Sequence, residues 1–376
     1  MKQISVLVII KENEPGLLSI ADNREKSLVQ VFDRTKIIDC YLRPFDTAGF
    51  SRLSVITDRD MTAIKDYVSY TYSSHKIKIV NESDVFRSLC NVLNLHQNEC
   101  ILILRADGLL FPDWINLKNF LLNLPNGNYE LITPQRNIIG YFLHNTKFIQ
   151  KLKGTGSVIN QRDSKVDSTW EVLEGTLHAS TESVEFKTLF IKLETVFDYF
   201  TVHFSLRHHL EQFIRKTPPS SVLNEEDLTR ITGTGFVKNS HVSTSCIIEG
   251  YVERSILFSH VKVGKSAHII NSIIMDNNFI GGGAVIQNAI VCDNGELFSR
   301  VTPNIGEDAR IGEDDSTGAN VLYPEFIHGG ITLIGQNVEI PKGFKISRNC
   351  FIASNVDKSI LKGWDKVKAG DSVLHS

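Results

Sequence analysis

A repeat in the second half of the chain restricts its fold more than any other feature of the sequence. From about residue 231, an aliphatic side chain returns roughly every six positions and is often followed by glycine. The repeat positions are Val242, Ile248, Val263, Ile269, Ile280, Ile305, Ile311, Ile334, Ile340 and Ile346. This period is typical of a left-handed parallel β-helix, in which each triangular coil takes about 18 residues. A β-sandwich is the alternative, but its strands should alternate with period two.

The repeat is interrupted twice. The segments CDNGELFSRVTPN and DDSTGANVLYPEFIHGG break the six-residue step, and the pattern resumes after Gly330. We expect loops at both interruptions. The end coils of a solenoid expose strand edges that can pair with another chain, so we also expect oligomerisation.

The first half of the chain has a different pattern, in which strand-like and helix-like segments alternate. The runs ISVLVII, RLSVIT, KIKIV and CILILR predict strands, and TKIIDCYLRPFDTAG, MTAIKDYVSYTY and DVFRSLCNVLNLH predict helices, with Gly49 and Asp84 as caps. Such alternation is typical of a doubly wound, mostly parallel α/β sheet. We therefore predict an α/β domain over residues 1–216, a linker over 217–230 at the PPSS segment, and the β-helix over 231–376.

Composition and charge argue against several classes of partner. The chain is 42% apolar and 22% charged, with a formal net charge of −3 and no run of like charge. We therefore expect neither nucleic acid nor an anionic membrane as a partner. The N-terminal apolar run is shorter than a signal peptide requires, and no stretch reaches the roughly 20 apolar residues of a membrane span, so the expected location is the cytoplasm.

The cysteines give no sign of a metal or redox site. They lie far apart, mostly in apolar runs, at Cys40, Cys90, Cys100, Cys246, Cys292 and Cys350. Without a pair at metal-ligand spacing, this pattern predicts buried, reduced thiols.

Ligands of doubly wound sheets bind where the strands end. Three informative ends read KENEPG, TDRD and RADG. A phosphate site after the first strand needs backbone N–H groups from glycines and usually a cation. Here Glu12 and Glu14 follow that strand. A carboxylate about 4 Å from an anion repels it by about 1 kcal/mol in water and by more in a cleft, so this segment is unsuited to phosphate.

Two longer motifs carry a resemblance to a known family. In NREKSLVQVFDRTKIIDCYL, six residues match the pattern RxKPxxPFGGxYRIIDFxLSN, and the run from IIEGYVERS to GGGAVIQNAIV matches a β-helix pattern over more than 40 residues. The six are Arg24, Lys26, Ile37, Ile38, Asp39 and Leu42. Both motifs resemble the ADP-glucose pyrophosphorylases, which are sugar-phosphate nucleotidyltransferases. The resemblance covers most of residues 1–292 and implies a Rossmann-like nucleotidyltransferase sheet of the GT-A type before the β-helix.

The resemblance implies a reaction in which glucose 1-phosphate attacks the α-phosphorus of ATP and releases pyrophosphate. That reaction needs amides and a cation for the triphosphate, acidic residues for Mg²⁺, and a cationic site for the sugar phosphate. The family's GGxGTRL loop falls on residues 11–16 and is replaced. Asp107 keeps the place of one metal-binding aspartate, with Asp113 where a second acid often follows. Lys192 replaces the other aspartate, and Glu194 lies two residues beyond it.

The sugar-phosphate segment is also missing. Active members carry a long insertion with an FxEKP motif, whereas here residues 110–136 separate the two flanking strands without it. This pattern of losses is similar to the GlgD-type noncatalytic subunit. The resemblance then implies a heterotetramer with a catalytic GlgC-type subunit, in which this chain requires no cofactor and shapes the response to effectors.

The resemblance also implies candidate residues for an effector, such as a sugar phosphate or a nucleotide. Arg24, Lys26, Arg34 and Lys36 lie in the segment that approaches the effector pocket in the family. A solvated basic face is the alternative for each of them.

Three other functions stay open. One is an active nucleotidyltransferase with displaced ligands, using Mg²⁺ at Asp107 with help from Glu194. Another is a hexapeptide acyltransferase, whose general base would be one of four histidines: His241, His260, His268 or His328. The third is a structural scaffold without a ligand.

Overall fold

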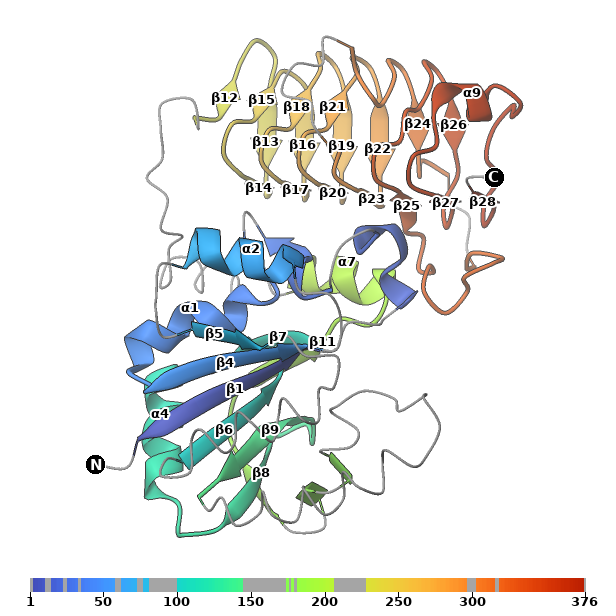
Figure 1. Cartoon of the computed structure of the whole chain (residues 1–376). Coiled ribbons are helices and arrows are strands. Elements are labelled where there is room, and N and C mark those ends of the chain that lie inside the picture. Colours follow the sequence, from blue (N-terminus) through green and yellow to red (C-terminus); the bar gives the residue numbers. More distant parts are fainter. Residues whose placement is uncertain are drawn as a thin grey trace.

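Figure 1 shows the 376-residue chain as a computed structural model. The structure describes residues 3–10, 15–22, 26–32, 35–57, 62–72, 77–80, 100–144, 174–175, 177–178, 181–205, 228–295, 302–314 and 318–374. The expected helix at DVFRSLCNVLNLH with its Asp84 cap, and most of the expected linker, lie outside these residues.

A seven-stranded sheet forms the first part of the chain, in the order β10-β8-β9-β6-β1-β4-β5. Its strands are β1 (Ile4–Ile10), β4 (Arg52–Thr57), β5 (Ile77–Val80), β6 (Cys100–Arg105), β8 (Asn128–Ile132), β9 (Ile138–Leu143) and β10 (Glu182–Glu185). β1 pairs in parallel with β4 and β6, and β9 runs antiparallel to β6 and β8. All seven residues of β1 are buried, as its sequence, apolar except for Ser5, predicts for a central parallel strand. The predicted mostly parallel α/β sheet is confirmed.

Within the described residues, four α-helices accompany this sheet: α1 (Asp39–Ala48), α2 (Thr62–Thr71), α4 (Trp114–Asn123) and α7 (Val196–Ser205). α1 ends at Gly49, which has φ of 67°, as predicted; glycine adopts this left-handed conformation without a Cβ penalty. Shorter elements are η1 (Pro15–Ile20) and η2 (Lys26–Leu28), both 3-10 helices, and the pairs β2 (Gln30–Phe32) with β3 (Thr35–Lys36) and β7 (Gly108–Phe111) with β11 (Leu189–Lys192). 

The second part of the chain is a parallel β-helix whose short strands form three sheets. The first contains β12 (Arg230–Ile231), β15 (Ile247–Ile248), β18 (Lys262–Val263) and β21 (Phe279–Ile280). The second contains β13 (Phe236–Lys238), β16 (Tyr251–Glu253), β19 (His268–Ile270), β22 (Val285–Gln287), β24 (Arg310–Ile311) and β26 (Lys345–Ile346). The third, which we call the docking sheet, contains β14 (His241–Val242), β17 (Ile256–Leu257), β20 (Ile273–Ile274), β23 (Ala289–Val291), β25 (Thr332–Ile334), β27 (Phe351–Ile352) and β28 (Ser372–Val373). 

The aliphatic repeat positions fill the interior of the β-helix. All of them are buried except Val242, which is partly buried in the first coil. The predicted left-handed β-helix therefore holds. The chain beyond Glu296 adds further coils, with β24 to β28 and the short helix α9 (Lys358–Leu361). Five cysteines within the described residues are buried free thiols, as predicted, and Cys90 lies outside those residues.

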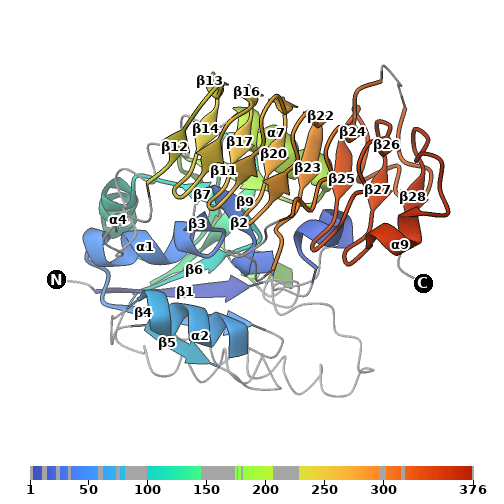
Figure 2. The ribbon, with the colours of Figure 1, turned by 90° about the horizontal axis from the view of Figure 1, so that it is seen from above.

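The docking sheet packs against the α/β domain. An apolar column on its outer side shares one core with the α/β domain; it consists of Ile256, Ile273, Ile290, Leu333 and Phe351. α7 lies under this sheet in both ribbon views (Figures 1 and 2). Its Phe197 ring stacks on His328 at 4.2 Å between centroids, and its buried His203 lies 6.0 Å from Phe258.

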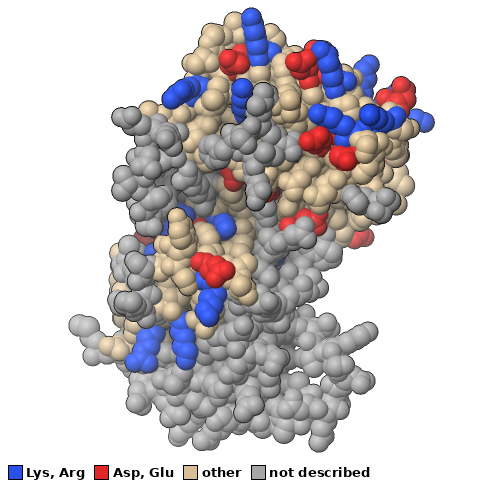
Figure 3. All heavy atoms as spheres, turned by 45° about the horizontal axis from the view of Figure 1, so that its top comes forward, with Lys and Arg blue, Asp and Glu red and all other residues tan. Residues whose placement is uncertain are grey.

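Charged side chains of both signs are interspersed on the face of the β-helix in Figure 3. Pairs such as Lys342 with Glu307, at 2.7 Å, and Lys238 with Glu253, at 3.1 Å, join neighbouring coils. Within the described part of the chain, no helix is long and apolar enough to cross a membrane.

Candidate functional site

The end of β6 carries Asp107, the residue at the place of a metal-binding aspartate. Its side chain is fully buried, and its carboxylate contacts the guanidinium Nε of Arg105, the last residue of β6. The hydroxyl of Tyr41 in α1 donates a hydrogen bond to the backbone carbonyl of Gly108, the residue after Asp107, at 2.9 Å. Burial, and then the charge of Asp107, raise the pKa of Tyr41, so this phenol stays protonated. 

Lys192 lies beside Asp107 in space although 85 residues separate them in sequence. β7 and β11 pair antiparallel, with Gly108 opposite Lys192. The two backbones approach so closely that a Cβ on Gly108 would overlap the carbonyl of Ile191. The structure thus brings together the two positions where the family resemblance expects two aspartates. One of them carries a carboxylate and the other an ammonium.

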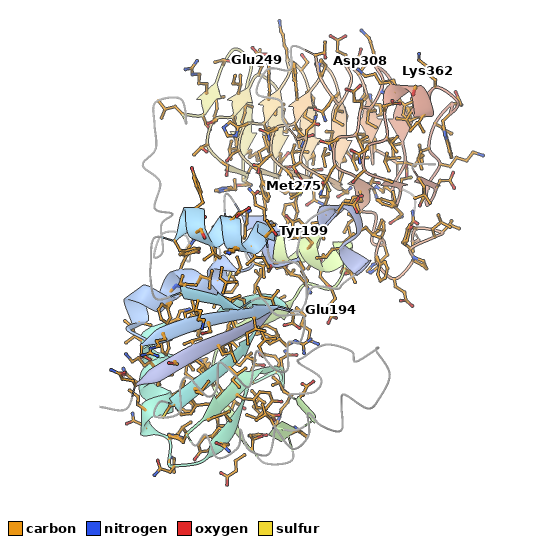
Figure 4. All side chains as sticks on the ribbon, viewed as in Figure 1. Glu194, Tyr199, Glu249, Met275, Asp308 and Lys362 are labelled. Carbon is orange, nitrogen blue, oxygen red and sulfur yellow. The ribbon has the colours of Figure 1, made fainter. Side chains whose placement is uncertain are left out.

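Glu194, the expected displaced ligand, is paired with that ammonium. Its Oε1 lies 3.4 Å from Lys192 Nζ, and both side chains are about half exposed. Figure 4 shows Glu194 at the edge of the sheet where β1 ends. Asp113 is also engaged elsewhere: it caps the N-terminus of α4, accepting from the backbone N–H of Asn116 at 3.1 Å.

These residues do not suit a magnesium ion. Mg²⁺ needs several oxygen ligands, usually from carboxylates and water. Here the buried carboxylate of Asp107 already contacts a guanidinium, and the residue across from Gly108 is a lysine whose ammonium pairs with Glu194. Among the described residues, no group of three or more His, Cys, Asp or Glu side chains is placed to hold a metal ion.

The candidate triphosphate loop is described only in part. Lys11, Glu12 and Glu14 lie outside the described residues. Gly16 lies in η1 and packs so tightly that an added Cβ would overlap the Glu194 carbonyl. The described end of this loop is therefore packed against the backbone after β11.

The four effector candidates differ in their surroundings. Arg24 and Arg34 lie outside the described residues. Lys26 is 2% exposed, whereas Lys36 is partly buried and its ammonium lies 4.0 Å from the centroid of the Tyr67 ring. Neither described lysine is fully open to solvent, and their role toward an effector stays a prediction.

Asp39, from the motif IIDCYL, forms a polar centre that the sequence did not indicate. Its buried carboxylate accepts hydrogen bonds from the Lys36 backbone N–H at 2.9 Å, from Arg43 at 3.1 Å, from Tyr67 at 2.8 Å and from Tyr72 at 2.5 Å. The donors come from β3, α1, α2 and the residue after α2, so one carboxylate ties these segments together. This residue of the family motif therefore supports the fold.

A second buried carboxylate was also missed. Glu130 on β8 accepts from Ser183 on β10 at 2.9 Å and lies 3.0 Å from the Nδ1 of His178. Its hydrogen bond and charge raise the pKa of the exposed His178. Burial, and then the charge of Glu130, raise the pKa of Tyr141 on β9. The signal in the sequence was the acid in the middle of the apolar strand NYELIT.

The four histidines proposed as general bases lie in unrelated places. His241 begins the docking sheet, His328 stacks on Phe197, His268 packs beside Tyr251, and His260 occupies a left-handed turn with φ of 63°. The described structure does not gather them into one site.

Comparisons with known proteins agree with the β-helix and point to one group of relatives. A family model described as "GlmU-like, C-terminal hexapeptide" matches residues 218–334. The glucose-1-phosphate adenylyltransferase of Acetivibrio thermocellus is 32% identical over 147 residues, covering 35% of this chain and 31% of that protein. The protein of the same name from Pseudothermotoga lettingae is 37% identical over 142 residues, covering 38% of this chain and 31% of that protein.

A shorter match, 40% identical over 55 residues, joins 15% of the chain to 16% of the "glycogen biosynthesis protein GlgD" of Geobacillus stearothermophilus. The matches thus span about a third or less of the length of these relatives. An α/β sheet followed by a hexapeptide β-helix, together with these partial matches at 32–40% identity, supports a relationship of the chain to the ADP-glucose pyrophosphorylase, or glucose-1-phosphate adenylyltransferase, family.

Proposed function

We propose that this chain is a noncatalytic, regulatory subunit of a bacterial glucose-1-phosphate adenylyltransferase. Its partner is a catalytic subunit of the same family, in a hetero-oligomer that makes ADP-glucose for glycogen in the cytoplasm. The likeness to a protein named GlgD supports this proposal over a relatively short stretch. 

The observation that carries the proposal is the charge arrangement at the end of β6. Arg105 neutralises the carboxylate of Asp107 from within the chain, and Lys192 stands where the second aspartate would be. A divalent cation placed there would have to compete with Arg105 for the one buried carboxylate, and it would find a lysine paired with Glu194 in place of a second aspartate. At about 4 Å a cation is repelled by a unit positive charge by at least about 1 kcal/mol in water, and by more in a buried site. We infer that the chain needs no metal and leaves the transfer of the adenylyl group to its partner.

The chain's contribution would be structural and regulatory. It keeps the β-helix and the apolar core between the two parts of the molecule, which a subunit needs for assembly. Lys26 and Lys36, with Arg24 and Arg34, remain the candidates for contact with an anionic effector such as a sugar phosphate or a nucleotide.

The first experiment measures the chain alone. The purified chain with ATP, glucose 1-phosphate and Mg²⁺ should release no pyrophosphate above a no-protein control. Turnover by the chain alone that Asp107→Ala abolishes would instead support an active enzyme with displaced ligands.

The second experiment adds the catalytic subunit of the same organism. We expect the two chains to co-elute and the mixture to differ from the catalytic subunit alone in turnover, substrate affinity or effector sensitivity. If the chains neither co-elute nor change these constants, the regulatory proposal is wrong. Binding of an acyl-coenzyme A in calorimetry would point to an acyltransferase.

A further inference from the structure

Side chains from two neighbouring coils of the β-helix form hydrogen bonds with residues 19–22, in the segment that follows β1. The side-chain amide of Gln336, just after β25, donates to the carbonyl oxygens of Ser19 and Asp22, both at 3.0 Å. The hydroxyl of Ser354, just after β27, donates to the Ser19 hydroxyl at 3.0 Å. Gln336, Ser354 and Ser19 are all buried. More than 300 residues of sequence separate the two sides of this contact.

These hydrogen bonds form one continuous chain. The backbone N–H of Gln336 donates to the Ser354 hydroxyl at 3.0 Å, this hydroxyl donates to Ser19, and Ser19 donates to Asp22 Oδ2 at 3.2 Å. Each bond in such a chain polarises the next, so the members act together. The positions of β25 and β27 are thereby linked to the conformation of residues 19–22.

The fastened segment holds a strained backbone. Leu18 has φ of 45° and ψ of −132°, a conformation that a residue with a side chain rarely adopts. The carbonyl of Leu18 accepts from the Ala21 N–H at 3.0 Å and closes a turn. Leu17 and Ile20 on either side are fully buried. Such strain persists only where the surroundings fix the conformation, and the hydrogen bonds from Gln336 lie directly beyond it.

We propose that Gln336, together with Ser354, is a clamp by which the β-helix sets the conformation of residues 15–22. The clamped state has the interdomain hydrogen bonds and the strained turn, and the released state loses both. Because the strain favours release and the hydrogen bonds oppose it, a small displacement of β25 and β27 changes the balance. Binding of another molecule to the β-helix can thereby change the conformation of the segment that follows β1.

The clamp can be tested on the isolated chain by hydrogen exchange of the segment 17–22. Gln336→Ala removes the donor, and Gln336→Glu keeps the size but places a carboxylate against two carbonyl oxygens. The loss of two hydrogen bonds should speed exchange of this segment by about tenfold or more in both variants, with β25 and β27 unchanged. Gln287→Ala, which alters a glutamine on β22 of another sheet, is the matched control and should have no effect on this segment.

Two outcomes would overturn the clamp. Unchanged exchange in both Gln336 variants would show that these hydrogen bonds do not hold the segment. Equal acceleration throughout β25 and β27 would show that Gln336 only stabilises the β-helix. Because a carboxylate and a methyl group replace the same amide, agreement between the variants separates loss of the donor from loss of packing.

A second arm rests on the proposed regulatory function. Mixed with the catalytic subunit, Gln336→Glu should co-elute as the unaltered chain does but lose at least half of its effect on turnover or effector sensitivity. Full retention of that effect, with faster exchange in the isolated chain, would overturn the clamp as a route of regulation. If the unaltered chain has no effect on the catalytic subunit, the proposed function fails, whereas the exchange experiment still decides the clamp.

Discussion

Replacing Asp39 by asparagine should destabilise the α/β domain strongly. The carboxylate is fully buried and accepts from four donors, one of which is the guanidinium of Arg43, whose side chain is 7% exposed. Asparagine keeps the shape but removes the charge and turns one acceptor into a donor. Removing one member of a buried ion pair typically costs about 3–5 kcal/mol, because the other charge stays buried without its partner. 

The asparagine carbonyl offsets part of this cost, because it still accepts hydrogen bonds. Each hydrogen bond to a charged group contributes about 1.5–3 kcal/mol, and the remaining oxygen still accepts from a tyrosine or from the Lys36 N–H. We therefore expect a loss of about 3 kcal/mol in the free energy of unfolding, measured by urea denaturation with circular dichroism. Asp113→Asn is the control: asparagine caps a helix as well as aspartate, so its loss should be under about 0.5 kcal/mol. 

A spectroscopic measurement separates the charge from a general loosening. Burial, and then the Asp39 charge and hydrogen bond, raise the pKa of Tyr67 and of Tyr72. In Asp39→Asn, tyrosinate absorbance should appear at lower pH than in the unaltered chain, before unfolding begins. A stability loss below about 1 kcal/mol together with an unchanged tyrosine titration would refute the account of Asp39 as a charged centre.

Three further predictions concern the site and the boundary between the two parts of the chain. Burial lowers the pKa of His203 in the folded chain to about 4, below the unfolded value of about 6.5. Between these two pH values only the unfolded chain binds the proton, so the free energy of unfolding should fall by about 3 kcal/mol from pH 6.5 to pH 4. His203→Leu should flatten this part of the pH profile of unfolding. Gly108→Ala should push β7 away from Ile191 and lower the denaturation midpoint. In the control Gly175→Ala, the new Cβ would have no atom beyond its chain neighbours within 4 Å, so the midpoint should not fall. Equal midpoints for the two variants would contradict the close approach at Gly108. Ile273→Ala in the docking sheet should cost about 2–5 kcal/mol in urea unfolding, as for other buried isoleucines, and a loss below 1 kcal/mol would mean that the sheet is not docked in solution.

The sequence predicted the β-helix well because its signal is local and repeated. Each coil contributes the same small set of inward positions, so Ile248, Ile280 and Ile340 could be placed without knowledge of distant contacts. The cap of α1 at Gly49 was predictable for the same reason, since a helix end depends on neighbouring residues only. Val242 differs from the other repeat positions because it lies in the first coil and has a neighbouring coil on one side only among the described residues.

The contact between the two parts was missed, although the sequence contained a signal for it. In the docking sheet both residues of most strands are apolar, as in Ile256–Leu257, Ile273–Ile274 and Phe351–Ile352. One residue of each pair faces the interior of the β-helix, and the other belongs to the core shared with the α/β domain. A solvent-facing strand would carry a polar residue at the second position. The partners of Gln336, by contrast, left no local trace, because they come from the other end of the chain.

Asp107 shows why a residue in the right place is weak evidence for an inherited function. Its register at the end of β6 was inferred from the sequence, and in the structure the position lies beside Lys192. What decides its chemistry is Arg105, two residues earlier, whose guanidinium supplies internally the positive charge that a metal ion would bring. An aspartate that loses its metal would be left as an unpaired buried charge, which is costly. An arginine at the end of the same strand offsets that cost, so Arg105→Leu should destabilise the chain, and under the proposed noncatalytic role the variant should still release no pyrophosphate.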